Sequence, residues 1–216
     1  MRTYAIAFAV FILSVSARAQ IANPTPDQIN AAIAQGIEGR GRSQGLLLAD
    51  NFSQFAQAFG ELGASQGKLQ PGTHVSASGF QVTIFTPLQW VAEKASEAAG
   101  QGVNFGPNDV TTDILRPVLH VVATPSTPPD VGTNWGFDVS DVVNVVLKDA
   151  SQRLAVEPSD AAPFAFQGLQ GLLAEFSLDD LATIRARNPE FYVVVFGRGN
   201  NQKAFKVKKK HFSRLP

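Results

Sequence analysis

Short valine-rich segments fill the second half of the sequence, and they constrain its fold more than any other feature. They lie at 118–124, 142–148, 154–157, 169–176, 191–196 and 204–208. Clusters of Pro, Gly, Asn and Asp separate them. β-Branched residues favour strands, whereas these clusters favour turns. Strands of this length and spacing predict a mainly β protein, an antiparallel β-sandwich, rather than alternating strands and helices.

One stretch of this region has a family likeness. Leu173-Ala-Glu-Phe176 is followed by Leu178 and Leu181, then by Phe191-Tyr192-Val-Val-Val195 and a final strand. This order resembles the E, F and G strands of immunoglobulin-like domains, in which an aromatic residue near the start of F closes the corner between E and F. The resemblance implies an immunoglobulin-like sandwich. Within it, Ser177 and Asp180 predict a capped helical turn.

Two Thr-Pro-x-Gln sequences predict where helices begin. Thr25 and Thr86 each stand at an N-cap, with Pro at the first helical position and Gln at the third. We expect a short helix from the first cap to about Gly36. The second cap opens a helix over 87–100, inserted after a strand of the sandwich. Trp90 falls off the apolar stripe of that helix, so we expect it to be partly exposed or to cover a neighbouring loop.

The sequence also predicts a domain organisation. Residues 20–70 form a helical and Gly-rich segment, in which 36–45 is a mobile loop and a phenylalanine stripe at 52–59 marks a helix. Residues 71–216 form the sandwich-like domain, which opens with a hairpin at 73–85. We interpret the phenylalanine stripe as core packing.

The first nineteen residues have the pattern of a secretory signal peptide. Arg2 precedes an apolar run from Tyr4 to Leu13, and Ala17-Arg18-Ala19 is a small-x-small cleavage sequence. We expect cleavage before Gln20. A membrane anchor is the alternative, but a spanning helix needs about 20 apolar residues and this run is half that length. We therefore expect no transmembrane segment in the mature protein.

Composition bounds the mature protein further. Cysteine is absent, so the chain has no disulfide and no thiolate ligand. A cysteine-free exported protein of this size fits a bacterial periplasm or bacterial secretion better than a eukaryotic extracellular setting. Charge is uneven: residues 20–189 hold nine Lys and Arg against seventeen Asp and Glu, whereas 190–216 hold seven against one. The tail is a basic element on an acidic body.

A nucleophile motif is the sharpest catalytic candidate. Residues 63–67, Gly-Ala-Ser-Gln-Gly, match the Gly-x-Ser-x-Gly elbow of α/β-hydrolases. That chemistry needs a strand before Ser65 and a helix after it, yet the preceding residues have helical periodicity and 68–72 cannot begin a long helix. The order Ser65, then Asp138 or Asp141, then His211 is formally allowed. We predict no catalytic residue and keep a secreted serine hydrolase using Ser65 as the alternative.

Metal and cofactor sites are not predicted. The histidines, His74, His120 and His211, do not fall at ligand spacing. His120 interrupts a strand and is interpreted as a surface or hydrogen-bonded residue. Acidic residues near loops lack the calcium-loop order and are interpreted as turns and caps; they are Asp109, Asp113, Asp138 and Asp141. Gly39-Arg40-Gly41 and Gly197-Arg198-Gly199 lack the context of a phosphate loop.

The basic tail carries the predicted binding residues, Lys206, Lys208, Lys209 and Lys210. Lys206 and Lys208 alternate with apolar residues, so they project from one face of a terminal strand. Two interpretations stay open. Lysines along an edge strand block pairing with another chain, and clustered cations bind anionic lipid headgroups, polysaccharide or an acidic protein. Nucleic acid is a poor partner, because no stacking aromatics lie between the charges.

Together these features predict an exported bacterial protein, periplasmic or secreted. We expect a non-enzymatic binding or structural module whose partner is a protein or polysaccharide of the envelope or the extracellular space. No cofactor is expected. The predicted core comprises Val82, Ile84, Leu88, Val91, Val121, Val145, Leu173, Phe176, Leu181, Val193, Val195 and Val207.

Overall fold

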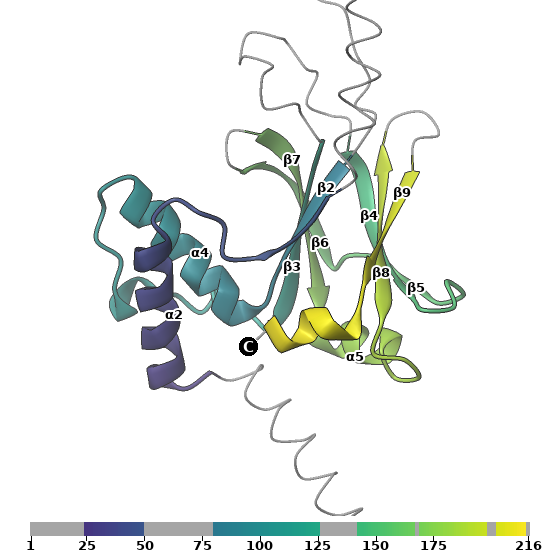
Figure 1. The fold of residues 1–216 in the computed structure, drawn as a ribbon, viewed down its shortest axis with the longest axis horizontal. Helices are drawn as coiled ribbons and strands as arrows, with labels where there is room; N and C mark the ends of the chain where they lie inside the picture. The colour runs from purple at the N-terminus through teal and green to yellow at the C-terminus, as the bar shows by residue number, and fades with distance from the viewer. Residues whose placement is uncertain (1–23, 50–79, 126–141, 167–168, 198–201, 215–216) are drawn as a thin grey trace, which may run out of the picture. The chain divides into compact units, whose positions relative to one another are not determined.

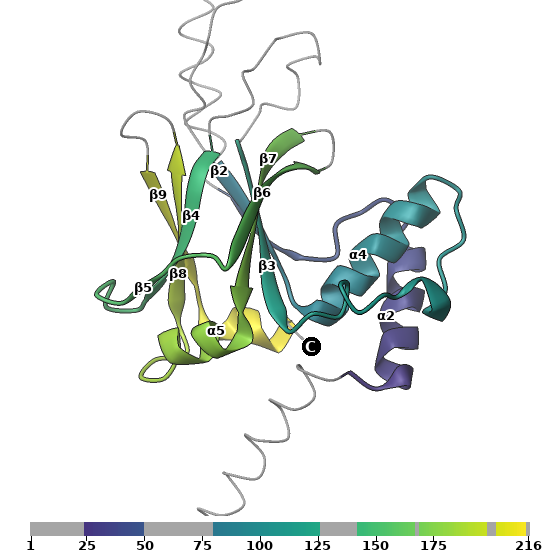
Figure 2. The same ribbon diagram turned by 180° about the vertical axis from the view of Figure 1, so that it is seen from behind.

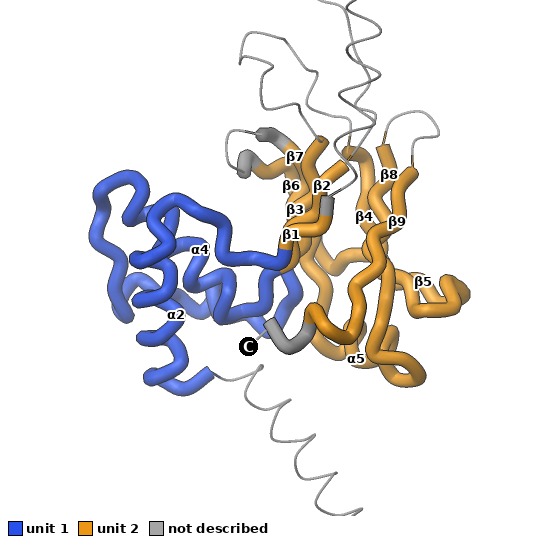
Figure 3. The backbone as a smooth tube through the Cα atoms, viewed as in Figure 1, with its two compact units in different colours: residues 1–46, 85–120, 212–216 blue, residues 47–84, 121–211 orange. Residues whose placement is uncertain are grey.

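The structure is a computed structural model that describes residues 24–49, 80–125, 142–166, 169–197 and 202–214. Several predicted features lie outside these residues: the signal peptide, the boundary at residue 70, the helix at 52–59 and the first strand of the hairpin at 73–77. The chain divides into two compact units (Figure 3). Unit 1 comprises residues 1–46, 85–120 and 212–216, and unit 2 comprises residues 47–84 and 121–211.

The described elements follow the chain in the order drawn in Figure 1. The helices are α2 (Pro26–Gly39), α4 (Pro87–Gly100) and α5 (Leu178–Ile184), with 3-10 turns η1 (Pro107–Asp109) and η2 (Lys209–Arg214). The strands are β1 (Leu46–Ala49), β2 (Phe80–Phe85), β3 (Val118–Pro125), β4 (Val142–Asp149), β5 (Ala155–Val156), β6 (Asp160–Phe166), β7 (Leu169–Ser177), β8 (Phe191–Gly197) and β9 (Gln202–Val207).

Both predicted helix caps are confirmed. The Thr25 Oγ1 accepts from the Gln28 backbone N–H at 3.3 Å, and the Thr86 Oγ1 accepts from the Gln89 N–H at 3.4 Å. In each cap the threonine N–H in turn donates to the glutamine Oε1, which completes a capping box. Helix α2 continues beyond the predicted end to Gly39, where Arg40 takes a left-handed conformation as C-cap.

In unit 1, helices α2 and α4 pack together along a stripe of small and branched residues. Its buried core comprises Ala32, Ile33, Val91, Ala92 and Ala95. Gly36 lies where the two backbones come closest: a Cβ built there would overlap the carbonyl oxygen of Ala92. A residue without a side chain is therefore what allows the helices this close approach.

The glycine-rich segment after α2 was predicted to be a mobile loop, and the structure instead ties it to α4. The Gln44 N–H donates to the Glu93 carboxylate at 2.7 Å, and the Ser96 hydroxyl donates to the Arg42 carbonyl at 2.9 Å. The Gly41 N–H donates to the Ser96 carbonyl at 2.9 Å. Burial raises the pKa of the Glu93 carboxyl, while the hydrogen bonds from the Gln44 N–H and the Ser43 side chain oppose this shift by favouring the ionised form.

In unit 2, the strands form two sheets, which Figure 2 shows from behind. One has the order β1-β2-β3-β7-β6, and the other has the order β5-β4-β8-β9. The pairs β4–β5, β4–β8, β8–β9 and β6–β7 are all antiparallel. The predicted class, a mainly β antiparallel sandwich with an inserted helix, is confirmed. The immunoglobulin-like relationship stays a prediction.

The core of unit 2 follows the predicted alternation of apolar residues in β9, where Phe205 and Val207 are buried while their neighbours are exposed. In β8, by contrast, the consecutive residues Val193, Val194 and Val195 are all fully buried. Of the predicted core, Leu88, Leu173 and Leu181 are only half-buried, and the others are buried. Ser177 caps the start of helix α5, as predicted, and its hydroxyl accepts from the Asp180 N–H at 3.0 Å.

The predicted exposure of Trp90 was wrong. Its side chain is only 6% exposed. Its ring meets Phe85 edge-on at 5.2 Å between centroids and stacks on His120 at 4.4 Å. A helical wheel counts apolar residues of one helix, so it cannot register aromatic partners that neighbouring strands supply. His120, predicted to be a surface or hydrogen-bonded residue, is 1% exposed.

Candidate functional site

Strand register gathers three chain segments at one end of the four-stranded sheet. Asp149 at the end of β4 pairs with Phe191 at the start of β8, and Phe191 pairs with Val207 at the end of β9. This row therefore adjoins three segments: the β4–β5 turn, the segment between α5 and β8, and the basic residues after β9. We call it the Asp149 end of the sheet.

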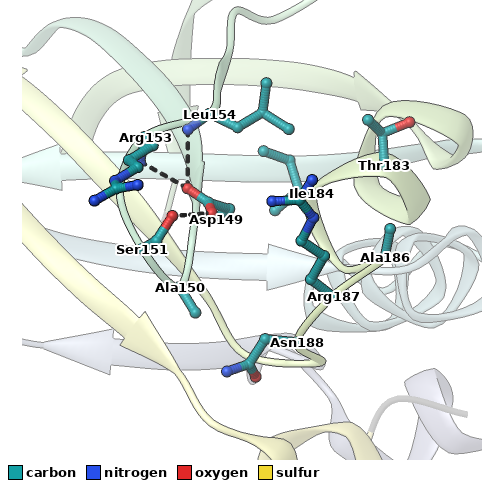
Figure 4. Close-up of a pocket in the computed structure, with 10 residues that line it drawn as sticks. All are labelled: Asp149, Ala150, Ser151, Arg153, Leu154, Thr183, Ile184, Ala186, Arg187 and Asn188. Carbon is teal, nitrogen blue, oxygen red and sulfur yellow. Dashed lines mark hydrogen bonds between the residues drawn. The ribbon is translucent and has the colours of Figure 1, made fainter.

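A cleft lies at the Asp149 end, with a volume of about 820 Å³. One wall is the β4–β5 turn, residues 149–154, and the other is formed by residues 183–188 from the end of α5 and the loop that follows (Figure 4). Each wall carries an aliphatic side chain: Leu154, which is 42% exposed, on the first wall and the buried Ile184 on the second. This volume is in the range of small-molecule sites, whose walls are usually apolar with a few polar groups.

The acidic group of the cleft is already engaged by its own turn. The Asp149 carboxylate accepts from the N–H groups of Arg153 at 2.8 Å and Leu154 at 2.9 Å, and from the Ser151 hydroxyl. Bonds from Ser151, Leu154 and Arg153 lower the pKa of Asp149 below its usual value. Asp149 is thus an ionised turn residue that has little capacity left to accept from a ligand.

Arginines provide the basic groups of the cleft. Arg153 and Arg187 are exposed, one on each wall, and in the described part of the chain neither guanidinium forms a salt bridge. Beside them, Arg185 is half-buried and its Nε donates to the Pro189 carbonyl at 3.2 Å. Burial lowers the pKa of Arg185.

The predicted basic residues lie at the Asp149 end, in the last part of β9 and directly after it. Lys206 forms a 2.7 Å ion pair with Glu190, which raises the pKa of the lysine and lowers that of the carboxyl. Lys208, Lys209 and Lys210 are exposed. Lys206 lies within β9, whereas Lys209 and Lys210 belong to η2. The structure therefore places all four predicted lysines at one end of the sheet but gives them different settings.

The predicted catalytic and metal candidates are not brought together among the described residues. Ser65, His74, Asp138 and Asp141 lie outside those residues. The His211 Nδ1 accepts from the Lys208 N–H at 3.2 Å, and Asp109 caps η1 by accepting from the Gly106 N–H at 2.8 Å. Over the described ranges, no group of three His, Asp or Glu side chains is arranged to hold a metal ion.

His120 has an aromatic environment in unit 1. Its ring stacks on Trp90 with 14° between planes, and the Lys94 ammonium lies 4.8 Å from the Trp90 ring centre. Burial, helped by the charges of Arg116 and Lys94, lowers the pKa of His120 to about 4. The imidazole is therefore neutral near pH 7.

Sequence reasoning missed Arg153 and Arg187. They are far apart in the sequence and belong to no motif, and only the pairing of β4 with β8 brings their segments together. No local signal in the sequence distinguishes them from other arginines in turns.

Comparison with known proteins gives little further information. No family model and no curated protein matches the chain. The crystal structure of a DUF4426 family protein from Pseudomonas aeruginosa PAO1 is similar over 61% of this chain and 85% of that chain, with 14% identity and a TM-score of 0.29. In the part of the chain that the structure describes, no helix is long and apolar enough to span a membrane.

Proposed function

We propose that the protein is an exported, non-enzymatic binding module of the bacterial periplasm or secretome. It docks on an acidic polysaccharide through the lysines that follow β9. The first nineteen residues support export, since they have the order of a signal peptide. The position of the lysines relative to the end of the strand supports docking.

The end of β9 supports docking on an anionic partner rather than edge protection as the role of the last three lysines. Edge protection requires charges along the unpaired side of a strand. It accounts for Lys203 and Lys206, which lie in β9, the edge strand next to β8. Lys208, Lys209 and Lys210 follow the last strand residue, Val207, and have no strand ladder to protect. Consecutive exposed cations in this position attract a polyanion such as an acidic polysaccharide.

Charge reversal tests this proposal. The double variant Lys208→Glu/Lys209→Glu is compared with Arg40→Glu/Arg42→Glu, which changes the net charge equally at exposed positions in unit 1. The measurement is the salt concentration that elutes the mature protein from immobilised polygalacturonate. We expect the lysine variant to elute at much lower salt than the wild type, and the arginine variant to elute close to the wild type.

Two results would contradict docking through the tail. If both variants elute alike, net charge alone governs retention. If the lysine variant is retained as strongly as the wild type, Lys208 and Lys209 do not contribute to binding. Circular dichroism of each variant checks that the β fold is intact.

A further inference from the structure

We infer that the cleft at the Asp149 end binds a small oxyanion, a carboxylate or a phosphate monoester, attached to a short apolar body. The inference concerns residues 149–154 and 183–188 and does not depend on the tail lysines. It adds a small-molecule site to the proposed polysaccharide contact.

The cleft carries donors that the protein leaves unpaired by carboxylates. Arg153 and Arg187 line it on opposite walls, and within the described residues neither guanidinium forms an ion pair with a carboxylate. Asn188 accepts from the Glu190 N–H at 2.9 Å through its Oδ1, which leaves the amide NH₂ as a further donor. A cleft with these groups selects a ligand that supplies acceptors rather than donors.

The charges favour an anion over a neutral acceptor. Two arginines against one aspartate leave a net positive charge on the lining. The Asp149 carboxylate opposes an incoming anion, but bonds from Ser151, Arg153 and Leu154 already take up its oxygens. A guanidinium offers paired N–H donors that match the two oxygens of a carboxylate or phosphate, so arginine is suited to this ligand class.

The apolar groups of the cleft define the rest of the ligand. Leu154 is 42% exposed although it is a large aliphatic side chain, and it lies on one wall of the cleft while the buried Ile184 lies on the other (Figure 4). An exposed leucine side chain is unfavourably hydrated. Packing an alkyl chain or the face of a sugar ring on it would remove apolar surface of both groups from water. The site therefore fits an amphipathic anion rather than free inorganic phosphate.

The test is an NMR titration of the ¹⁵N-labelled mature protein with three probes that share a six-carbon chain: hexanoate, hexyl phosphate and neutral hexyl glucoside. We expect one or both anions to shift the amide signals of residues 149–154 and 183–188, and the glucoside to bind at least tenfold more weakly. The stronger of the two anions identifies the head group. Equal binding of the glucoside, or no shift at the cleft with either anion, would overturn the inference.

Variants assign the binding to the arginines. Arg153→Gln and Arg187→Gln should each raise the Kd of the better anion about tenfold, the size expected for losing one charge-assisted hydrogen bond. Arg42→Gln, the matched control in unit 1, should leave the Kd unchanged. Lys208→Glu/Lys209→Glu should also leave it within about twofold. A tenfold loss in either of these would mean that general charge rather than the cleft binds the anion, and would overturn the inference without bearing on the polysaccharide test.

Discussion

His120 makes the stability of the protein depend on pH. Its folded-state pKa is lowered to about 4 by burial and by the nearby charges of Arg116 and Lys94. The unfolded chain therefore binds a proton as the pH falls below about 6.5, while the folded chain stays neutral until about 4. The stability contributed by neutral His120 is fully present above pH 6.5 and declines as the pH falls through this window. Between pH 7.5 and pH 5 we expect a loss of about 2 kcal/mol from this residue.

Replacing the imidazole should remove that dependence. His120→Phe keeps a flat ring against Trp90 but has no proton to bind. Urea denaturation at pH 7.5 and pH 5 should show a smaller drop in the free energy of unfolding for this variant than for the wild type. His211→Phe, which replaces a histidine that is not fully buried, serves as the control and should keep the wild-type drop. An equal pH dependence in wild type and His120→Phe would show that His120 is not the responsible group.

At the scale of elements, the sequence and the structure predict opposite effects of the substitution Gly36→Ala on stability. Helix propensity alone predicts that Gly36→Ala stabilises α2 by up to about 1 kcal/mol. The structure predicts destabilisation, because the new methyl group would overlap the Ala92 carbonyl of α4, and backbone cannot move aside as a side chain can. We expect a net loss of about 1–2 kcal/mol, within the usual cost of overpacking. Thermal denaturation measures it, with exposed Asn30→Ala as a control that should be neutral or slightly stabilising. A higher melting temperature for Gly36→Ala would contradict this packing of α2 on α4.

The elements that the sequence predicted are those whose signals are local. The caps at Thr25 and Thr86 and the alternation in β9 depend on residues a few positions apart, and the structure confirms them. β6 was missed because its sequence, rich in Ala and interrupted by Pro163, has little strand propensity. β6 forms because β7 pairs with it along its whole length in an antiparallel ladder. Pro163 is tolerated there because β6 is an edge strand.

The candidate site follows the same division. The tail lysines were predictable, since four cations within five residues form a local pattern. The cleft was not, because it depends on the register that sets Asp149 opposite Phe191 and so brings two loops together. Register is determined by the burial of whole strand faces, which no single loop sequence records.

At the scale of the whole molecule, the proposal depends on export, and export makes a definite prediction about the chain. A signal peptidase needs small residues at the last and third-last positions before the cut, which are Ala19 and Ala17. When the full-length chain is expressed in a bacterial host, the exported form should begin at Gln20. Ala19→Arg should block cleavage, because a long charged side chain does not fit where alanine does, whereas Arg18→Gln at the tolerant middle position should be processed normally. Intact-mass measurement of the periplasmic and cytoplasmic fractions distinguishes these outcomes. Recovery of the uncleaved chain from the cytoplasm, or normal processing of Ala19→Arg, would remove the support for an envelope partner and leave the basic tail to be explained inside the cell.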